Sequence, residues 1–156
     1  MIFSHYNIFS IPRAAVFILL GIIASAFYTI NAQQLSSRTM SQNMEKFLEY
    51  RTTDRDTAHI YAERIIADLD STVVGEDVAI LYDFMAEYNE SVLHRYEKAL
   101  DYRLRAISVY EAMNNIPCTT RTYALLSRTY LRNSDYHNAF SYGVKALDGG
   151  RSLGDS

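Results

Sequence analysis

One pattern occurs three times in this chain, as TAHIYAERII (residues 57–66), KALDYRLRAI (98–107) and NAFSYGVKAL (138–147). A small residue stands near the start of each copy, and the alanines at 58, 99 and 139 lie 41 and then 40 residues apart. A tyrosine, a cation and an aliphatic residue recur at matching places: Tyr61, Tyr102 and Tyr142; Arg64, Arg105 and Lys145; Ile66, Ile107 and Leu147. Self-similarity at this period is typical of stacked helical arrays, so the sequence predicts an all-α fold.

Length and composition indicate one globular unit and disfavour one class of partner. The chain has 156 residues, of which 49% are hydrophobic and 21% charged, the usual balance of a folded domain. Its formal net charge of -3 disfavours nucleic acid as a partner, because a phosphate backbone is normally bound by a cationic face. Cys118 is the single cysteine, so an internal disulfide is excluded and the fold depends on helix packing.

The amino terminus differs from the rest of the chain. Residues 14–30 read AAVFILLGIIASAFYTI without a charge, Arg13 precedes them, and the small residue Ala32 follows before two glutamines. This order predicts that residues 1–32 are a signal peptide cleaved after Ala32, and that the protein is exported to the periplasm or another extracytoplasmic space. The alternative is a retained anchor in the inner membrane, since seventeen apolar residues reach the lower limit of about 17 for a membrane span.

The mature chain divides into a leading segment and the repeats. Residues 33–53 are expected to form a polar linker and a weakly patterned first helix, and residues 54–156 the helical repeats. Asp56 is the expected N-cap of the first repeat helix, and Gly149 and Gly150 are expected to end the last one. The apolar residues between these points recur at helical spacing, and no strand pattern is present.

The segment from Tyr123 to Leu147 resembles a tetratricopeptide repeat (TPR), a helix-turn-helix unit. The match places an aromatic residue, a Leu-small pair and a tyrosine on the first helix, and a tyrosine and two alanines on the second: Tyr123, Leu126, Ser127, Tyr130, Tyr136, Ala139 and Ala146. A weaker preceding repeat has Leu81, Phe84 and Tyr88 on its first helix, Tyr96, Ala99 and Ala106 on its second, and a turn two residues longer. Ala58 is the matching alanine of the first copy of the pattern, at residues 57–66. The resemblance implies a right-handed α-solenoid of antiparallel helix pairs.

The period of about 40 residues exceeds the 34 of the common TPR. It is similar to the long-period variety found in extracytoplasmic regions of bacterial sensors and regulators. The resemblance therefore implies a non-enzymatic, exported module that binds a protein or peptide. The alternative is a truncated sensory region of a TPR-containing histidine kinase or transcriptional regulator.

In such repeats the concave surface is formed by first-helix residues that avoid the core. The match places Arg121, Ala124, Arg128 and Leu131 there, with Arg132 at the edge, and Tyr82 and Asn89 at corresponding places one repeat earlier. Arginines at helical spacing are suited to bidentate hydrogen bonds with carboxylates, so an acidic peptide is the predicted partner. A solvated charged face is the competing interpretation.

Other site chemistries are not indicated. The histidines lack the spacing that holds a metal on one helix face, and neither a Gly-rich phosphate loop nor a catalytic motif is present, so no metal, cofactor or enzymatic activity is expected. The last helix has no polar capping helix after it, so its outer face is expected to be exposed and to mediate self-association.

Overall fold

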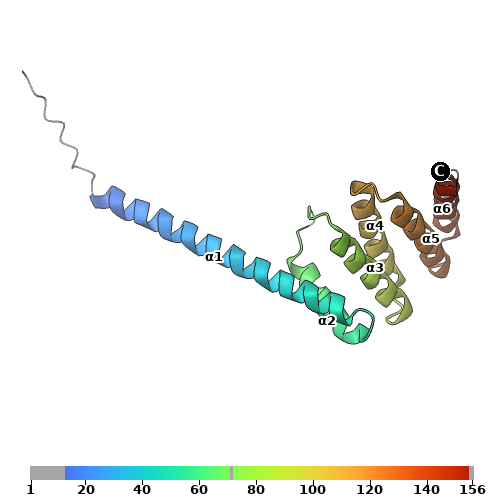
Figure 1. Cartoon of the computed structure of the whole chain (residues 1–156), viewed down its shortest axis with the longest axis horizontal. Helices are drawn as coiled ribbons and strands as arrows, with labels where there is room; N and C mark the ends of the chain where they lie inside the picture. Colours follow the sequence, from blue (N-terminus) through green and yellow to red (C-terminus); the bar gives the residue numbers. More distant parts are fainter. Residues whose placement is uncertain (1–12, 71, 155–156) are drawn as a thin grey trace, which may run out of the picture. The chain divides into compact units, whose positions relative to one another are not determined.

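The computed structural model describes residues 13–70 and 72–154, and these residues form helices and no strand (Figure 1). The helices are α1 (Arg13–Tyr50), α2 (Arg55–Asp68), α3 (Glu76–Ser91), α4 (Tyr96–Ala112), α5 (Ile116–Arg132) and α6 (Tyr136–Gly154). The predicted all-α class is confirmed. None of the described helices is long and apolar enough to cross a membrane.

The chain divides into two compact units, with the boundary between residues 41 and 42. In the first unit the described residues belong to α1, and the exposed large apolar side chains there include Ile18, Leu20, Ile22, Ile23, Phe27, Tyr28 and Ile30. The expected linker is helical up to Tyr50 instead, and within it the hydroxyls of Ser37 and Thr39 donate to carbonyls one turn earlier. Residues 1–12 of the predicted signal peptide lie outside the described residues.

The helix starts follow local side-chain chemistry. Asp54, rather than the expected Asp56, caps α2, and its carboxylate accepts a 3.1 Å hydrogen bond from the Thr57 amide. Asp56 is already inside the helix, where it accepts a 2.6 Å hydrogen bond from the Tyr88 hydroxyl. Asn115 caps α5 in the same way as Asp54, with Pro117 in the first turn of that helix.

The last helix is longer than expected. It continues through Gly149 and Gly150 to Gly154, because none of the described glycines takes the left-handed conformation that would end it. A Cβ at position 149 would overlap the side chain of Thr120 on α5, whereas a Cβ at position 150 would meet nothing within 4 Å. Glycine at 149 therefore permits close helix packing instead of ending the helix.

In the second unit each helix packs against its neighbours in sequence. Side by side in Figure 1, α3 contacts α4, α4 contacts α5 and α5 contacts α6, while α2 lies against α3. The shared alanines Ala58, Ala99, Ala106 and Ala139 are buried at these contacts, and Ala146 is half-buried. Tyr136, expected to pack, is exposed at the first position of α6.

The helix pairs α3–α4 and α5–α6 repeat one set of ring contacts. The rings of Tyr82 and Tyr102 lie 6.3 Å apart, with the Arg105 guanidinium 6.0 Å from the Tyr82 ring. In the second pair the rings of Tyr123 and Tyr142 lie 5.9 Å apart, with the Lys145 ammonium 5.4 Å from the Tyr123 ring. Tyr82 is therefore the counterpart of Tyr123, 41 residues earlier, while the counterparts on α4 and α6 are 40 apart.

This correspondence corrects the register predicted for α3. The residues that match Tyr123, Leu126 and Tyr130 are Tyr82, Met85 and Asn89, not Leu81, Phe84 and Tyr88. The loop at residues 92–95 is longer by one residue than the loop at residues 133–135. The match to the TPR pattern predicts a loop that is longer by two residues. Leu81 is buried as well, while the rings of Phe84 and Tyr88 face the preceding helices, 5.2 Å from Phe47 and 4.2 Å from His59.

Candidate functional site

A groove runs between α3 and α5 and contains the three arginines predicted for the binding surface, Arg121, Arg128 and Arg132. Two adjoining pockets of about 260 and 240 Å³ form it, and both are lined by Asp83, Glu87 and Arg121. The first pocket extends to Arg51 and Thr52 after α1 and to apolar Ile80 and Phe84, and the second to Arg103, Leu125 and Arg128. We call this surface, together with Glu90 and Arg132, the arginine groove.

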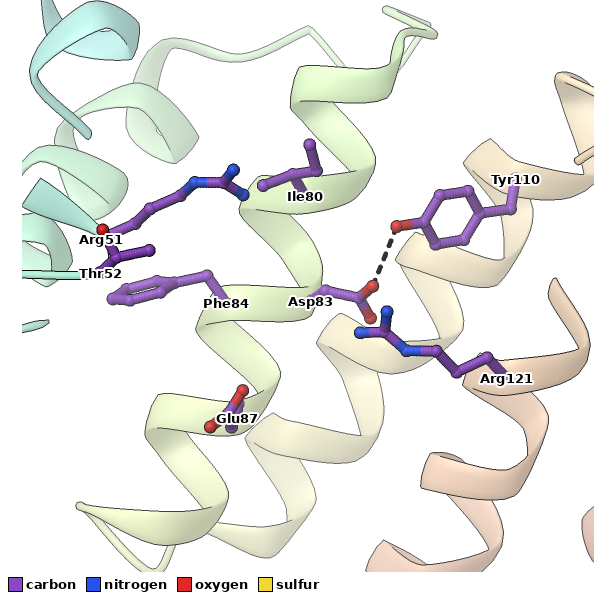
Figure 2. Close-up of a pocket in the computed structure, with 8 residues that line it drawn as sticks. All are labelled: Arg51, Thr52, Ile80, Asp83, Phe84, Glu87, Tyr110 and Arg121. Atoms are coloured by element: carbon purple, nitrogen blue, oxygen red, sulfur yellow. Dashed lines mark hydrogen bonds between the residues drawn. The ribbon is translucent and has the colours of Figure 1, made fainter. Parts of the chain in front are cut away.

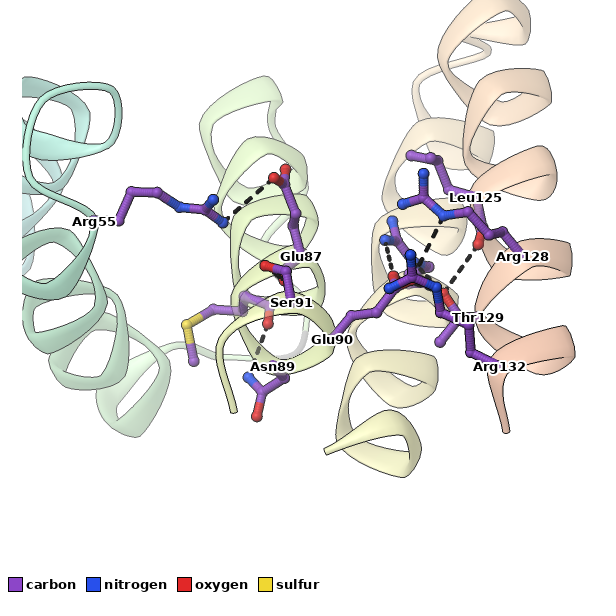
Figure 3. Close-up of polar contacts among 11 residues, drawn as sticks. Arg55, Glu87, Asn89, Glu90, Ser91, Leu125, Arg128, Thr129 and Arg132 are labelled. Carbon is purple, nitrogen blue, oxygen red and sulfur yellow. Dashed lines mark hydrogen bonds and ion pairs between the residues drawn. The ribbon is translucent and has the colours of Figure 1, made fainter. Parts of the chain in front are cut away.

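Glu90 lies at the centre of the polar contacts in the groove (Figure 3). Its Oε2 accepts a 2.7 Å hydrogen bond from Arg103 on α4, and both side chains are at least 98% buried. The Thr129 hydroxyl on α5 lies 3.0 Å from the same oxygen and accepts a 2.9 Å hydrogen bond from Arg103 Nε. One carboxylate thus connects three consecutive helices of the stack.

Two further arginines approach the other oxygen of Glu90 more loosely. Nε of Arg128 and Nη1 of Arg132 lie 3.5 and 3.4 Å from Oε1, which accepts no hydrogen bond from any residue that the structure describes. Both arginine side chains are half-exposed. Burial raises the pKa of Glu90, but the Arg103 hydrogen bond and the surrounding positive charge outweigh it, so the pKa is lowered overall. Glu90 is therefore ionised and serves as a shared counter-ion.

Asp83 forms a second polar centre in the floor of the groove (Figure 2). Its Oδ2 accepts a 2.9 Å hydrogen bond from the Tyr110 hydroxyl, while its buried Oδ1 has no hydrogen-bond partner within residues 13–70 and 72–154. The guanidinium group of Arg121 is turned toward it from α5. Burial raises the pKa of the Asp83 carboxyl, and the Tyr110 hydrogen bond and the charges of Arg103 and Arg121 only partly oppose this shift.

The groove is cationic although the chain is acidic. Arg51, Arg103, Arg121, Arg128 and Arg132 face three carboxylates, those of Asp83, Glu87 and Glu90, which leaves an excess of two positive charges. Glu87 is further engaged by Arg55, whose Nη2 lies 3.3 Å from its Oε1. The net charge of the whole chain is -3, so this surface has the opposite sign to the rest of the molecule.

Some predicted site residues lie in the groove and others do not. Arg121 and Arg128 line it, and Arg132 reaches Glu90. Ala124 and Leu131 are exposed on α5 but line neither of its two pockets. Tyr82 and Asn89 are buried, because α3 is rotated relative to the expected register; Tyr82 joins the core and the Asn89 amide donates to the Met85 carbonyl.

The acidic wall on α3 was missed, although the sequence contains a signal for it. Asp83, Glu87 and Glu90 are spaced by four and three residues, which places them on one helix face. They stand 41 residues before Ala124, Arg128 and Leu131, and the same 41-residue step separates the first two repeated alanines. The sequence also contains a signal for the role of Arg103, because this charged residue lies within the buried stripe of Ala99, Ala106 and Tyr110.

Comparisons with protein-family models, with curated proteins and with solved structures found no match to this chain. Within residues 13–70 and 72–154, no group of three or more His, Cys, Asp or Glu side chains is arranged to hold a metal ion. The assignment of function therefore depends on the groove itself.

Proposed function

We propose that this protein is a non-enzymatic, TPR-like α-solenoid that binds an acidic peptide segment of a partner protein in the arginine groove. The observation that carries the proposal is the sharing of Glu90 by three guanidinium groups. Arg103 makes the close buried pair, and Arg128 and Arg132 remain half-exposed at distances of 3.4 to 3.5 Å. Their outward N–H groups are free to donate to a ligand, and bidentate contact with carboxylates is the interaction guanidinium favours.

The geometry of α5 favours an extended peptide. Side chains four residues apart, such as Arg128 and Arg132, start about 5 to 6 Å from one another on one helix face. Alternate residues of an extended strand point the same way and are about 6.4 to 6.8 Å apart. Carboxylates at every second position of a strand therefore match this pair, and Arg121, two turns before Arg128, extends the match along the groove.

Buried contacts hold the arginines in place before a ligand binds. Glu90, Arg103 and Thr129 connect α3, α4 and α5, so the groove walls are fixed by the core instead of by surface loops. A site that is already ordered loses less conformational entropy on binding. The apolar side chains of Ile80 and Phe84 near Arg51 offer contact to an apolar residue beside the acidic positions.

A synthetic peptide with glutamate at every second position, labelled with fluorescein, tests the proposal by fluorescence anisotropy. We expect the double variant Arg128→Gln/Arg132→Gln to weaken binding at least tenfold. The control Arg64→Gln/Arg151→Gln removes the same charge outside the groove and should change the affinity less than twofold. Equal losses in the two variants, or equal binding of a lysine-substituted peptide, would contradict the proposal.

Export is part of the same proposal and has a separate test. The uncharged run at residues 14–30 and the small Ala32 support secretion, with the mature chain beginning at Gln33. The intact mass of the extracytoplasmic protein should match a chain that begins at Gln33. A full-length chain retained in the membrane fraction would instead support an anchored protein.

A further inference from the structure

A second cavity, separate from the arginine groove, lies between the first half of α5 and the second half of α6. It encloses about 300 Å³ and shares no lining residue with the groove pockets. We call it the α5–α6 notch, and its main lining residues are Ile116, Thr119, Thr120, Tyr123, Lys145 and Gly149. Its accessible lining is mainly apolar, and its volume is at the lower end of small-molecule sites.

The helix contact at the notch differs from the matching contact in the preceding helix pair. The counterpart of Gly149 is Val109, whose side chain is buried in a cluster with Val78, Ala79 and Tyr82. The counterparts of Val78 and Ala79 are Thr119 and Thr120. Because residue 149 has no side chain, the α6 backbone lies directly against Thr120, whose side chain occupies the place that a Cβ at residue 149 would take.

Lys145 provides a cation at the notch without an acidic partner. Its ammonium group lies 4.8 Å from the ring centre of Tyr142 and 5.4 Å from that of Tyr123, and it makes no ion pair with any described residue. Its counterpart Arg105 pairs with Asp101 at 2.9 Å, one turn earlier on α4. The residue at the matching place on α6 is Ser141, so the carboxylate is missing from this repeat.

The remaining polar groups at the notch include a carboxylate, whose charge opposes an anionic ligand, and a hydroxyl that can donate to one. Glu111, the carboxylate that lines it, accepts a 2.5 Å hydrogen bond from the Tyr123 hydroxyl. The Thr120 hydroxyl has no hydrogen-bond partner among the described residues. An ammonium group and a free hydroxyl next to an apolar surface are what a single carboxylate attached to an apolar group would need.

We propose that the α5–α6 notch binds an apolar group that carries one carboxylate, with the carboxylate on Lys145 and the apolar part against Ile116 and the threonine methyl groups. The volume of about 300 Å³ is more than sufficient for a phenyl or leucyl side chain. Such a ligand has two sources, a free aryl or alkyl carboxylic acid and the carboxyl-terminal apolar residue of a peptide.

The test is a titration of the ¹⁵N-labelled full chain, followed by NMR. 3-Phenylpropionate should shift the amide signals of Thr119, Thr120 and Gly149 saturably, at least fivefold more tightly than the uncharged 3-phenylpropanamide. Lys145→Gln should abolish this difference, whereas Lys98→Gln on α4 and the groove variant Arg128→Gln/Arg132→Gln should preserve it. Equal affinity of the acid and the amide for the unmodified protein, or shifts confined to other surfaces, would overturn the proposal.

A second pair of ligands distinguishes the two sources. Acetyl-Gly-Gly-Phe with a free carboxyl terminus is compared with its amidated form and with 3-phenylpropionate. Tighter binding of the free-carboxyl peptide than of 3-phenylpropionate identifies a chain end, and the reverse order identifies a free acid. Both results support the site. The site is excluded if the peptide binds as tightly as its amide and 3-phenylpropionate binds as tightly as its own amide.

Discussion

The guanidinium group of Arg103 on α4 donates a 2.7 Å hydrogen bond to Glu90 on α3, in the interior of the helix stack. Each residue contributes a charge that the core could not accommodate alone, because an unpaired ion loses its hydration on burial. The two half-exposed arginines of α5, Arg128 and Arg132, lie within 3.5 Å of the same carboxylate. Stability and the proposed binding site therefore depend on the same carboxylate.

Glu90→Gln is expected to lower the free energy of unfolding by about 3 to 5 kcal/mol, since it leaves the buried Arg103 unpaired. The matched control is Glu87→Gln, which removes an exposed pair with Arg55 and should cost about 1 kcal/mol or less. Urea unfolding at pH 7 measures both. Similar losses in the two variants would show that the buried pair does not stabilise the fold.

The cost of Glu90→Gln should also depend on pH in a defined direction. The pKa of Glu90 is lowered in the folded state, so its contribution is present above the unfolded pKa of about 4.3 and is lost as pH falls through the folded value. The stability difference between the two proteins should therefore shrink on acidification. A constant difference from pH 7 down to pH 2 would contradict the assignment.

At Asp83 we expect stability to depend on pH in the opposite direction. Because burial raises its pKa, the unmodified protein loses stability as pH rises from the unfolded value of about 3.9 through the folded pKa. Asp83→Asn preserves an acceptor for Tyr110 without the buried charge, and should melt at a higher temperature at pH 7 but not at pH 3. Asp101→Asn, at an exposed pair, should give no such gain. A lower melting temperature of Asp83→Asn at pH 7 would mean that the charge is compensated.

How far the sequence predicted this architecture can be seen on α3 and α5. The repeated alanines and tyrosines were sufficient to predict the helices, and two of the arginines assigned to the binding surface, Arg121 and Arg128, line the groove. On α3 an error of one residue in the assumed loop length rotates the helix assignment by about 100°. That rotation interchanged surface and core, so Tyr82 and Asn89 were assigned to the surface and the acidic residues were overlooked.

The buried ionic contacts were harder to predict than the helix faces. Nothing local in the sequence indicates that Glu90 reaches Arg103 and Thr129, which are 13 and 39 residues away. Such a pairing requires the relative rotation of three helices, and the rotation is determined by side-chain packing across the whole core. The role of Gly149 was hidden for the same reason, since its contact with Thr120 is tertiary.

Gly149 and Gly150 should respond oppositely to the same substitution. Gly150→Ala places a methyl group in open space within a helix and should stabilise the protein by about 0.5 to 1 kcal/mol. Gly149→Ala should destabilise it, because the methyl group would overlap Thr120. Thermal unfolding of the two single variants is the measurement. Stabilisation by both would mean that α6 does not pack closely at residue 149.

The outer face of α6 is expected to mediate self-association. Phe140 and Leu147 are 76% and 54% exposed, whereas their counterparts Leu100 and Ile107 are 9% and 5% exposed and pack against Leu126 of α5. An apolar stripe of this kind marks an interaction surface. Sedimentation velocity across a concentration series should show oligomers that Phe140→Asp/Leu147→Asp dissociates. Ile60→Asp, at an exposed apolar residue of α2, is the control and should leave them intact.

The most direct test of the central claim is selection from a random peptide library displayed on phage, carried out in parallel on three immobilised proteins. These are the unmodified chain, Arg128→Gln/Arg132→Gln and the control Arg64→Gln/Arg151→Gln. The arginine groove predicts that the unmodified chain and the control enrich peptides with Asp or Glu at alternate positions, and that the groove variant does not. Enrichment of the same acidic peptides on the groove variant, or the absence of acidic enrichment on the unmodified chain, would contradict it.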